Sequence, residues 1–472
     1  MPKKYKKGLF VFHRDLRIVD NTGLVQACID CEKVYTCFIF TPEQVGAQNK
    51  YRSLPAIRFM LESLTELSAE IRKRGGELHV VFGDPTDRCR ELIQTLDISA
   101  VYINRDYSPY AVDSDRKLAL LCDSRQVEFH DFADTYLFEP GTVKTSTGKY
   151  YQKYTPFYDT VVSLKVPKPY PAYTPHTKTF RAFSGVVPHE TTLKAMFDKL
   201  VGHEKVESRA VHGGRHFALE RLRKSVREQT KYDDRRDFFE HETTRLSAYL
   251  KFGCISVREA YHEWLSAFGR HSGLIRELIW REYYAHILYG FPHVLGGVVY
   301  RNIRWRTSAR DFERWKQGQT GFPLVDACMR QLNATGYMHN RGRMVVAHFL
   351  VKTLLIHWKR GEEYFAQRLV DYDPASNNGN WQRISGTGID RAPYFRDMNP
   401  WIQSAKYDPD AKFIRHWVPE LADVPPVEIH KWEVYAYDST HRKTRYPKPM
   451  VSYREQKEKM LEMYRRASFH AD

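Results

Sequence analysis

The sequence lacks any long hydrophobic run. Nothing in its 472 residues approaches the roughly 18 consecutive apolar residues that a membrane-spanning helix requires. The first residues, Met-Pro-Lys-Lys-Tyr-Lys-Lys, hold no apolar stretch of the kind that a secretory signal carries. We therefore expect an intracellular protein, in the cytoplasm or the nucleus, that has no membrane partner.

Cysteine-rich and glycine-rich sites are missing as well. The seven cysteines are scattered, and Cys28-Ile-Asp-Cys31 lacks the second pair that a zinc site needs, which favours reduced structural thiols and no metal. No Gly-x-Gly-x-x-Gly follows the first β-rich run, Leu9–Phe12, so the sequence predicts no dinucleotide phosphate cradle there. The sequence also shows no Ser/His/Asp or paired-carboxylate arrangement typical of hydrolases.

What the chain does have is size, apolar residues and positive charge. A length of 472 residues predicts two domains, and 42% hydrophobic residues are enough to pack a core in each. The formal net charge of +16 favours a polyanionic partner, most simply nucleic acid. We expect the protein to be a monomer.

The N-terminal part alternates β-rich runs with helical patterns. The runs are Leu9–Phe12, Val34–Phe40, Leu78–Phe82 and Ala100–Ile103, and the helical patterns are Ala56–Arg74 and Thr86–Leu96. This alternation predicts a parallel, Rossmann-like α/β sheet in a first domain spanning residues 1–134. A connector over residues 135–212 follows, and it includes the proline-rich stretch Lys165–Pro188.

The remaining residues, 213–472, predict an all-α domain. The apolar pattern changes to a helical period, and few strand-like runs interrupt it. Pro323 is well placed to begin a helix. The predicted helices are Ala218–Glu228, Arg245–Leu250, Val257–Ala267, Leu274–Tyr289, Leu324–Asn333, Asn340–Ile356 and Glu362–Val370.

Three polar motifs stand out in this second part. Asp371–Arg383 holds two carboxylates and a run of Asn, Ser and Gly behind Pro374, which predicts a polar loop. Thr243–Ser247 would place hydroxyls at a helix start, either as a plain N-cap or as an anion site. Glu277, Trp280, Arg281 and Tyr284 share one helical face, typical of either an amphipathic helix or a surface that stacks and hydrogen-bonds an extruded base pair.

These motifs, with Gly336–Met344 and the opening Val11–Asn21, resemble the photolyase/cryptochrome family. The resemblance runs from about Leu9 to about Pro425 and keeps the motifs in order. It implies that the helical domain binds FAD and that the α/β domain carries a second, light-harvesting chromophore. The residues that match the family's flavin contacts are Tyr232, Thr243, Thr244, Arg245, Leu246, Ser247, Glu277, Arg281, Asn340, Arg343, Asp371, Asp373 and Asn377.

The resemblance also implies a reaction and a substrate. Glu277, Asn340, Met344 and Asn377 match catalytic positions, and an Arg343–Asp371 pair is expected. Trp315, Trp358 and Trp381 match the chain that carries electrons from the surface to the flavin, although each could be a core residue. The positions that match contacts to UV-damaged DNA are Arg236, Trp280, Arg281, Tyr284, Asn340, Arg341, Arg383, Arg396 and Gln403.

Within the family, Asn340 and Met344 favour enzymes that repair cyclobutane pyrimidine dimers, because 6-4 photoproduct enzymes carry histidines at these two places. Asn377 favours repair over plant-type photoreceptors, which have Asp there. Three alternatives stay open: a cryptochrome-like photosensor, a 6-4 photoproduct lyase, and a basic flavoprotein that binds DNA without repairing it.

The chain departs from the family pattern at two places. Arg383 stands where many relatives have an aromatic residue against the flipped dimer, and it could supply a cation–π contact or a phosphate bond instead. Gly296-Gly297 replaces the Cys-Lys pair that helps some relatives bind folate. Asn104–Tyr110 looks more like the subgroup with an 8-hydroxy-5-deazaflavin or flavin antenna, for which Lys251 is a candidate contact.

Overall fold

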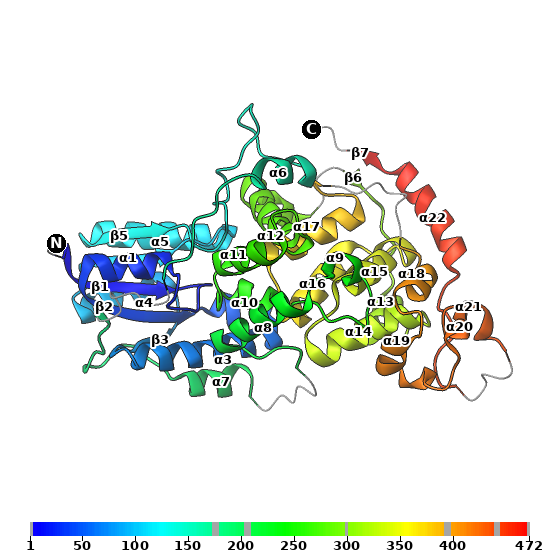
Figure 1. Cartoon of the computed structure of the whole chain (residues 1–472), viewed down its shortest axis with the longest axis horizontal. Helices are drawn as coiled ribbons and strands as arrows, with labels where there is room; N and C mark the ends of the chain where they lie inside the picture. The colour runs from blue at the N-terminus through cyan, green and yellow to red at the C-terminus, as the bar shows by residue number, and fades with distance from the viewer. Residues whose placement is uncertain are drawn as a thin grey trace.

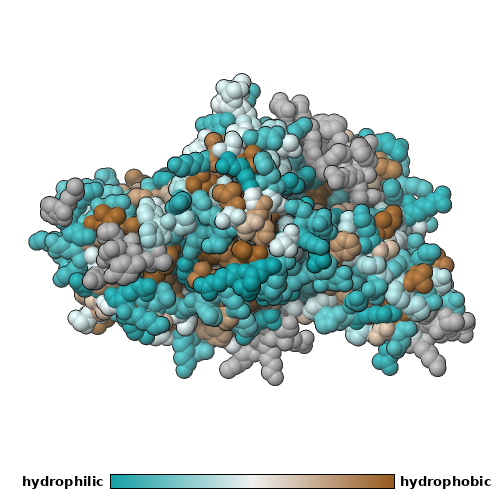
Figure 2. Space-filling model, viewed as in Figure 1, coloured by the Kyte–Doolittle hydropathy of each residue, from teal (hydrophilic) through white to brown (hydrophobic). Residues whose placement is uncertain are grey.

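The computed structural model describes residues 3–171, 179–202, 209–297, 301–390, 398–438 and 444–469. In these residues a parallel sheet with its helices forms the N-terminal end of the molecule, and a larger helical body forms the rest (Figure 1). No helix in the described ranges is long and apolar enough to cross a bilayer. The face drawn in Figure 2 is mostly hydrophilic, with hydrophobic residues in scattered patches.

The sheet has five parallel strands in the order β3-β2-β1-β4-β5. Their bounds are β1 Tyr5–Phe12, β2 Cys31–Phe40, β3 Leu78–Phe82, β4 Ala100–Asn104 and β5 Glu128–Phe132. The four predicted runs are therefore confirmed as strands. The fifth strand was missed because it is a half-exposed edge strand whose polar and aromatic residues form no apolar run.

Helices cover both faces of this sheet, as the alternation of side chains along a strand requires. Phe10 and Phe12 pack towards α1 and α3, whereas Leu9 and Val11 pack towards α4 and α5. The helices of this domain are α1 Thr22–Asp30, α2 Pro42–Val45, α3 Leu54–Arg72, α4 Pro85–Leu96 and α5 Pro109–Ser124. The predicted α/β architecture is confirmed.

Two short helices, α6 Tyr154–Val161 and α7 Leu193–Leu200, interrupt the predicted connector. The described part of the proline-rich stretch Lys165–Pro188 contains no α-helix. Residues 172–178 of that stretch lie outside the described residues. The limits 1–134, 135–212 and 213–472 stay predictions.

The described residues of the second half are mainly helical. Its helices are α8 Arg215–Glu228, α9 Tyr232–Arg235, α10 Ser247–Lys251, α11 Val257–Phe268, α12 Gly273–Gly290, η2 Pro292–Gly296, α13 Ala309–Gln317, α14 Pro323–Thr335, α15 Asn340–His348, η3 Phe349–Thr353, α16 Trp358–Arg368, α17 Pro374–Ser385, α18 Pro400–Tyr407, α19 Lys412–Trp417, η4 Pro419–Leu421, α20 Pro426–Ile429, α21 Trp432–Tyr435 and α22 Tyr453–Arg466. An antiparallel pair of strands is also present, β6 Arg301–Asn302 with β7 Ser468–Phe469.

Three local predictions were wrong. The segment expected to be a polar loop is the helix α17, because Asp373 accepts the backbone N–H of Ser376 and Pro374 occupies the first turn, where a proline is tolerated. The helix predicted from Arg245 begins only at Ser247, since Arg245 has a left-handed φ of 51°. The helix predicted to reach Ile356 changes to a π-turn after His348.

Two hydrophobic cores meet inside the helical half. The first runs from the α1/α3 face of the sheet into α10, α11 and α12, and the second is built around α13 to α16 and α19. Helix α17 contributes to both, with Ala375 in the first core and Trp381 in the second. This helix therefore joins the two cores, and its Trp381 belongs to the core that lies beside the cavity described below.

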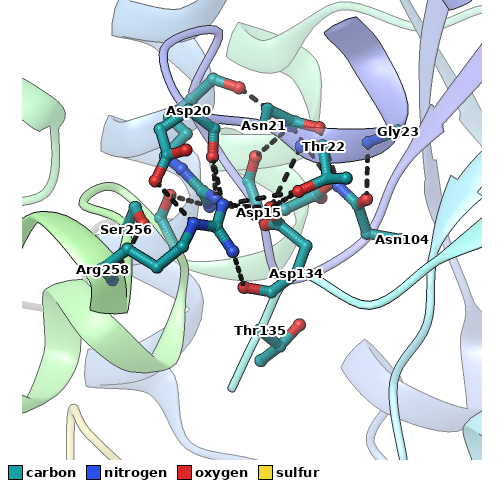
Figure 3. A network of polar contacts seen from close by, with 12 residues as sticks. Asp15, Asp20, Asn21, Thr22, Gly23, Asn104, Asp134, Thr135, Ser256 and Arg258 are labelled. Carbon is teal, nitrogen blue, oxygen red and sulfur yellow. Dashed lines mark hydrogen bonds and ion pairs between the residues drawn. The ribbon is translucent and has the colours of Figure 1, made fainter. Parts of the chain in front are cut away.

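A buried polar network joins the α/β domain to the helical half (Figure 3). Arg258 of α11 donates to Asp134 at 2.7 Å and to Asp20 at 3.0 Å, and Arg17 donates to Asp134 at 2.5 Å. Burial alone would raise the pKa of Asp134, but Arg17 and Arg258 outweigh it and hold the pKa at about 2.

Candidate functional site

A cavity opens between α15, α16 and α17. Seven residues predicted from the sequence line it together: Asn340, Arg343, Met344, Asp371, Asp373, Asn377 and Trp381. Tyr372, Ser376, Asn380 and Ile384 complete much of the wall and were not predicted. Residues far apart in the sequence thus converge on one polar and aromatic cavity.

The predicted pairing of Arg343 with Asp371 is present. The two guanidinium nitrogens Nη1 and Nη2 donate to the two carboxylate oxygens at 3.2 and 2.8 Å, which is a bidentate arrangement. Ser247 Oγ donates to the same carboxylate at 2.6 Å. This pair fixes the start of α10 against the cavity wall.

The rest of the Thr243–Ser247 motif lies beside this pair. The hydroxyls of Thr243 and Tyr337 are 3.2 Å apart, and the Thr244 hydroxyl accepts from Leu246 N at 3.3 Å. Leu246 itself is buried. Thr244 therefore closes a local turn, whereas Ser247 reaches a side chain that lines the cavity.

Asp373 connects the cavity to the α/β domain. Arg14 Nη1 donates to its Oδ2 at 2.8 Å, and Arg14 also donates to the hydroxyl of Tyr136 at 3.3 Å. Burial, with Arg14 nearby, lowers the pKa of Lys251 to about 8. Lys251, Arg14 and Asp373 thus lie together where the α/β domain meets the helical half.

The α12 residues that were predicted to share one helical face contact different parts of the molecule. Glu277 Oε1 accepts from Arg236 at 2.5 Å, and Tyr284 donates to Asn380 Oδ1 at 3.1 Å, next to the cavity. Arg281 instead lies over Tyr136 and donates to the carbonyl of Thr135 at 2.9 Å. Arg281 therefore contacts the start of the connector that follows the sheet, and its roles in binding DNA and FAD stay predictions. Glu277 is not among the side chains that line the cavity.

Trp280 is covered on both sides in this structure. Tyr154 stacks on it with ring centroids 3.4 Å apart and planes 4° apart, and the guanidinium of Arg383 lies 4.6 Å from its centroid. Two parallel rings in contact leave only the opposite face for Arg383. Arg383 also approaches Asp390 at 3.7 Å. The predicted cation–π contact of Arg383 is thus made to the protein's own tryptophan.

Two of the other predicted DNA contacts, Arg341 and Gln403, lie within the described residues. Arg341 forms an ion pair with Asp237 and lies over Tyr407 at 4.5 Å. Gln403 is half-buried on α18. Arg396 falls outside the described residues. Three of the predicted guanidiniums, those of Arg236, Arg341 and Arg383, are therefore each held near a carboxylate.

Known proteins resemble this chain over nearly its whole length. Residues 274–466 match the family described as the FAD binding domain of DNA photolyase, and residues 9–175 match the family described as DNA photolyase. A relative from Halobacterium salinarum named deoxyribodipyrimidine photo-lyase is 35% identical over 97% of this chain and 99% of its own. The chain belongs to the DNA photolyase family.

Two solved photolyase structures have the same fold. An archaeal photolyase from Sulfolobus tokodaii with two FAD molecules is 38% identical and has a TM-score of 0.84, covering 97% of this chain and 99% of its own. A bacterial class III photolyase from Agrobacterium tumefaciens is 31% identical with a TM-score of 0.89, covering 98% of both chains. The predicted FAD-binding helical domain is therefore confirmed.

The three tryptophans predicted as an electron relay in this photolyase are all buried. Trp315 and Trp381 lie 6.4 Å apart, centroid to centroid, and Trp315 also stacks on Phe312 and Phe365. Trp358 lies 5.8 Å from His357. None of the three reaches the surface, so a relay from the surface needs a further residue.

Sequence reasoning missed three residues of this photolyase site: Arg14, Tyr154 and Trp305. Trp305 is half-buried, and its ring lies 5.4 Å from that of His357, which also lies beside Trp358. Trp305 is therefore a candidate for the step between Trp358 and the surface. Arg14 lies in the Val11–Asn21 motif, so the resemblance already singled out its segment. Tyr154 lies within the predicted connector over residues 135–212, where no motif indicated that it stacks on Trp280.

Proposed function

We propose that this photolyase is a light-dependent lyase that splits cyclobutane pyrimidine dimers in DNA. The observation that carries the proposal is the cavity between α15 and α17, where Asn340, Met344 and Asn377 lie beside the Arg343–Asp371 pair. The name of the Halobacterium salinarum relative, deoxyribodipyrimidine photo-lyase, supports the same reaction.

The residues of the cavity suit FAD. Arg343 and the hydroxyls of Thr243 and Ser247 are the kind of groups that hold a pyrophosphate, and Asp371 and Asp373 can accept from ribose or ring N–H groups. Asn377 Nδ2 donates to the carbonyl of Glu362 at 3.0 Å, which leaves its Oδ1 to accept from the cavity. Bound there, reduced FAD supplies a photoexcited electron that opens the dimer and is then returned.

The chain's own part is recognition rather than proton transfer. Flipping a dimer out of the duplex costs a few kcal/mol, which is less for a damaged pair than for an intact one. Arg236, Arg341 and Arg383 offset this cost at phosphates. Trp280 offers a ring for stacking once Arg383 has moved from its face to a phosphate, and Glu277 offers an acceptor for the dimer's N–H groups. The net charge of +16 supports association with DNA.

The surroundings of His339 favour dimer repair over repair of 6-4 photoproducts. Burial lowers its pKa to about 4, and its Nδ1 accepts from Arg341 N at 3.2 Å as the N-cap of α15. A neutral, buried histidine that caps a helix is not placed to donate a proton to a lesion at neutral pH. Asn340 and Met344 occupy the cavity wall instead.

The second chromophore and the electron route complete the proposal. The two FAD molecules of the Sulfolobus tokodaii photolyase support a flavin or deazaflavin antenna, with Lys251 as a candidate contact between the domains. For photoreduction we propose Trp381 as the residue nearest the flavin, because it lines the cavity. Trp315, Trp358 and Trp305 are the candidates for the outward steps.

The test is repair by the reduced, FAD-loaded protein under blue light. Oligonucleotides containing either a cyclobutane dimer or a 6-4 photoproduct are incubated in light and in darkness, and restored thymines are counted. We expect repair of the dimer alone and only in light. Repair of the 6-4 product alone, or of neither, contradicts the proposal.

A pair of matched variants ties the activity to the cavity. Asn377→Ala removes an amide from the cavity wall and should slow repair about tenfold or more, as loss of a preorganised polar contact does. Asn333→Ala is the control, because Asn333 makes comparable hydrogen bonds to Lys316 and Tyr364 but does not line the cavity. Equal rates in the two variants would separate repair from this cavity.

A further inference from the structure

A short segment, Tyr232–His241, crosses the region between α12 and α15 and is referred to here as the strap. At its start, Asp233 Oδ2 accepts from Gly273 N, at the first residue of α12. Near its end, Phe239 N donates to the carbonyl of Tyr407 at the end of α18. In Figure 1 the strap's helix, α9, lies in the middle of the helical half. The strap thus spans elements that carry the predicted DNA contacts.

Two neighbouring residues of the strap pair in opposite directions. Arg236 donates to Glu277 on α12 at 2.5 Å, and Asp237 pairs with Arg341 on α15. The side chains differ in exposure: 29% and 39% for Arg236 and Glu277, against 27% and 12% for Asp237 and Arg341. Arg341 is also covered by Tyr407. The α15 side is therefore the fixed end, and the α12 side is the one that can exchange partners.

Arg236 and Glu277 can each bind a different part of damaged DNA in place of one another. A phosphate competes with the Glu277 carboxylate for the guanidinium of Arg236. The N–H groups of a flipped pyrimidine dimer, freed from base pairing, compete with Arg236 for the carboxylate. In intact duplex those N–H groups stay in base pairs, so only the first competition takes place.

Resting on the proposed function, we propose that Glu277 and Arg236 form an exchangeable latch that links lesion reading to phosphate binding. With intact DNA, Glu277 retains Arg236 and withholds one phosphate contact. With a flipped dimer, the lesion takes Glu277 and Arg236 is released to the backbone. An ion pair of this exposure is weak enough for such exchange, because water already screens it. Glu277 thus weakens the binding of undamaged DNA and also accepts hydrogen bonds from the lesion, so it determines specificity in two ways.

The decisive variant is Glu277→Gln, measured by the binding of two duplexes that differ only in one dimer. Freed from its carboxylate, Arg236 should bind undamaged DNA more tightly. The log–log slope of affinity against salt should steepen by about 0.9, the contribution of one phosphate contact. Affinity for the dimer-containing duplex should fall about tenfold, as expected when a charged acceptor is lost. The opposite signs on the two duplexes are what a general loss of folding does not produce.

Two further variants separate the latch from a charge effect. Glu420→Gln makes the same charge change and frees Arg330, which donates to Glu420 at 2.8 and 3.0 Å away from the cavity; it should leave both affinities unchanged. In the double variant that carries both Arg236→Gln and Glu277→Gln, the tighter binding of undamaged DNA should disappear. Persistence of that tightening, an equal effect of Glu420→Gln, or an unchanged salt slope in Glu277→Gln each overturns the latch.

Failure of the proposed function gives a different result. A wild-type protein that binds both duplexes equally and repairs neither under light would contradict dimer repair. In that case a gain in affinity and salt slope for Glu277→Gln on undamaged DNA would still show that Glu277 withholds Arg236 from phosphate, whereas the link to lesion reading would be overturned.

Discussion

Two sets of ion pairs in this molecule use the same residue types with opposite consequences. In the network between the domains, Asp134 is wholly buried and two guanidiniums, those of Arg17 and Arg258, share it. Between the segment Tyr232–His241 and α12, Arg236 and Glu277 form a single pair that is partly open to water. Separated charges cost far more in the first setting than in the second. Exposure therefore distinguishes the pairs that hold the domains together from those available to a ligand.

The largest expected effect comes from removing a charge within the buried network. Asp134→Asn leaves Arg17 and Arg258 with one carboxylate fewer and should lower the free energy of unfolding by about 3–5 kcal/mol. Urea unfolding at neutral pH measures it. Because the pKa of Asp134 is lowered to about 2, its stabilisation is full above the ordinary range near 4 and is lost as the pH falls towards 2.

The matched control for that variant lies on the surface of α5. Asp113 also accepts from two cations, Arg116 and Lys117, but all three side chains are exposed. Asp113→Asn should leave the unfolding midpoint unchanged. An equal loss in the two aspartate variants would show that burial does not separate the two kinds of ion pair.

The second prediction concerns His339, the N-cap residue of α15. Its pKa is lowered to about 4, so between pH 6.5 and 4 the unfolded chain binds a proton that the folded protein refuses. The free energy of unfolding should therefore fall with decreasing pH in this window, by up to about 1.4 kcal/mol per pH unit from this residue.

His339→Asn isolates that contribution, since asparagine can still cap α15. Unfolding curves at several pH values should show a shallower loss between pH 6.5 and 4 than in wild type. His416→Asn changes an exposed histidine and is the control. A variant profile that runs parallel to the wild type would mean that His339 titrates in the folded protein as it does in the unfolded chain.

Much of the fold could be predicted because local patterns agree with it. Four of the five strands, and most of the long helices, follow from runs of apolar residues. The predictions failed where a local rule has two meanings. Pro374 ends a helix or begins one, and here the preceding Asp373 decides for a beginning. The edge strand Glu128–Phe132 carries too few buried residues to leave an apolar signature.

The candidate site divides in the same way. Residues close in sequence, such as Asp371, Asp373 and Asn377, could be grouped by spacing and resemblance, and they do line one cavity. Contacts between distant segments could not be read from the sequence. Arg14 and Asp373 lie 359 residues apart, and nothing in either motif indicates that they pair. Exposure, which differs between the side chains of Arg236 and Arg258, is likewise a property of the packed chain alone.

The smallest expected effect on stability tests the exposed side of the comparison at Arg383. Its guanidinium covers Trp280 and approaches Asp390 at 3.7 Å, yet a third of the side chain is open to water. Arg383→Gln should therefore lower the free energy of unfolding by at most about 1 kcal/mol, the value of a partly exposed cation–π contact. The same urea experiment on Arg17→Gln, in the buried network, should show a several-fold larger loss. If Arg383→Gln were as destabilising as Arg17→Gln, the guanidinium on Trp280 would be a structural clamp, and a lesion could reach that ring only by disrupting the fold.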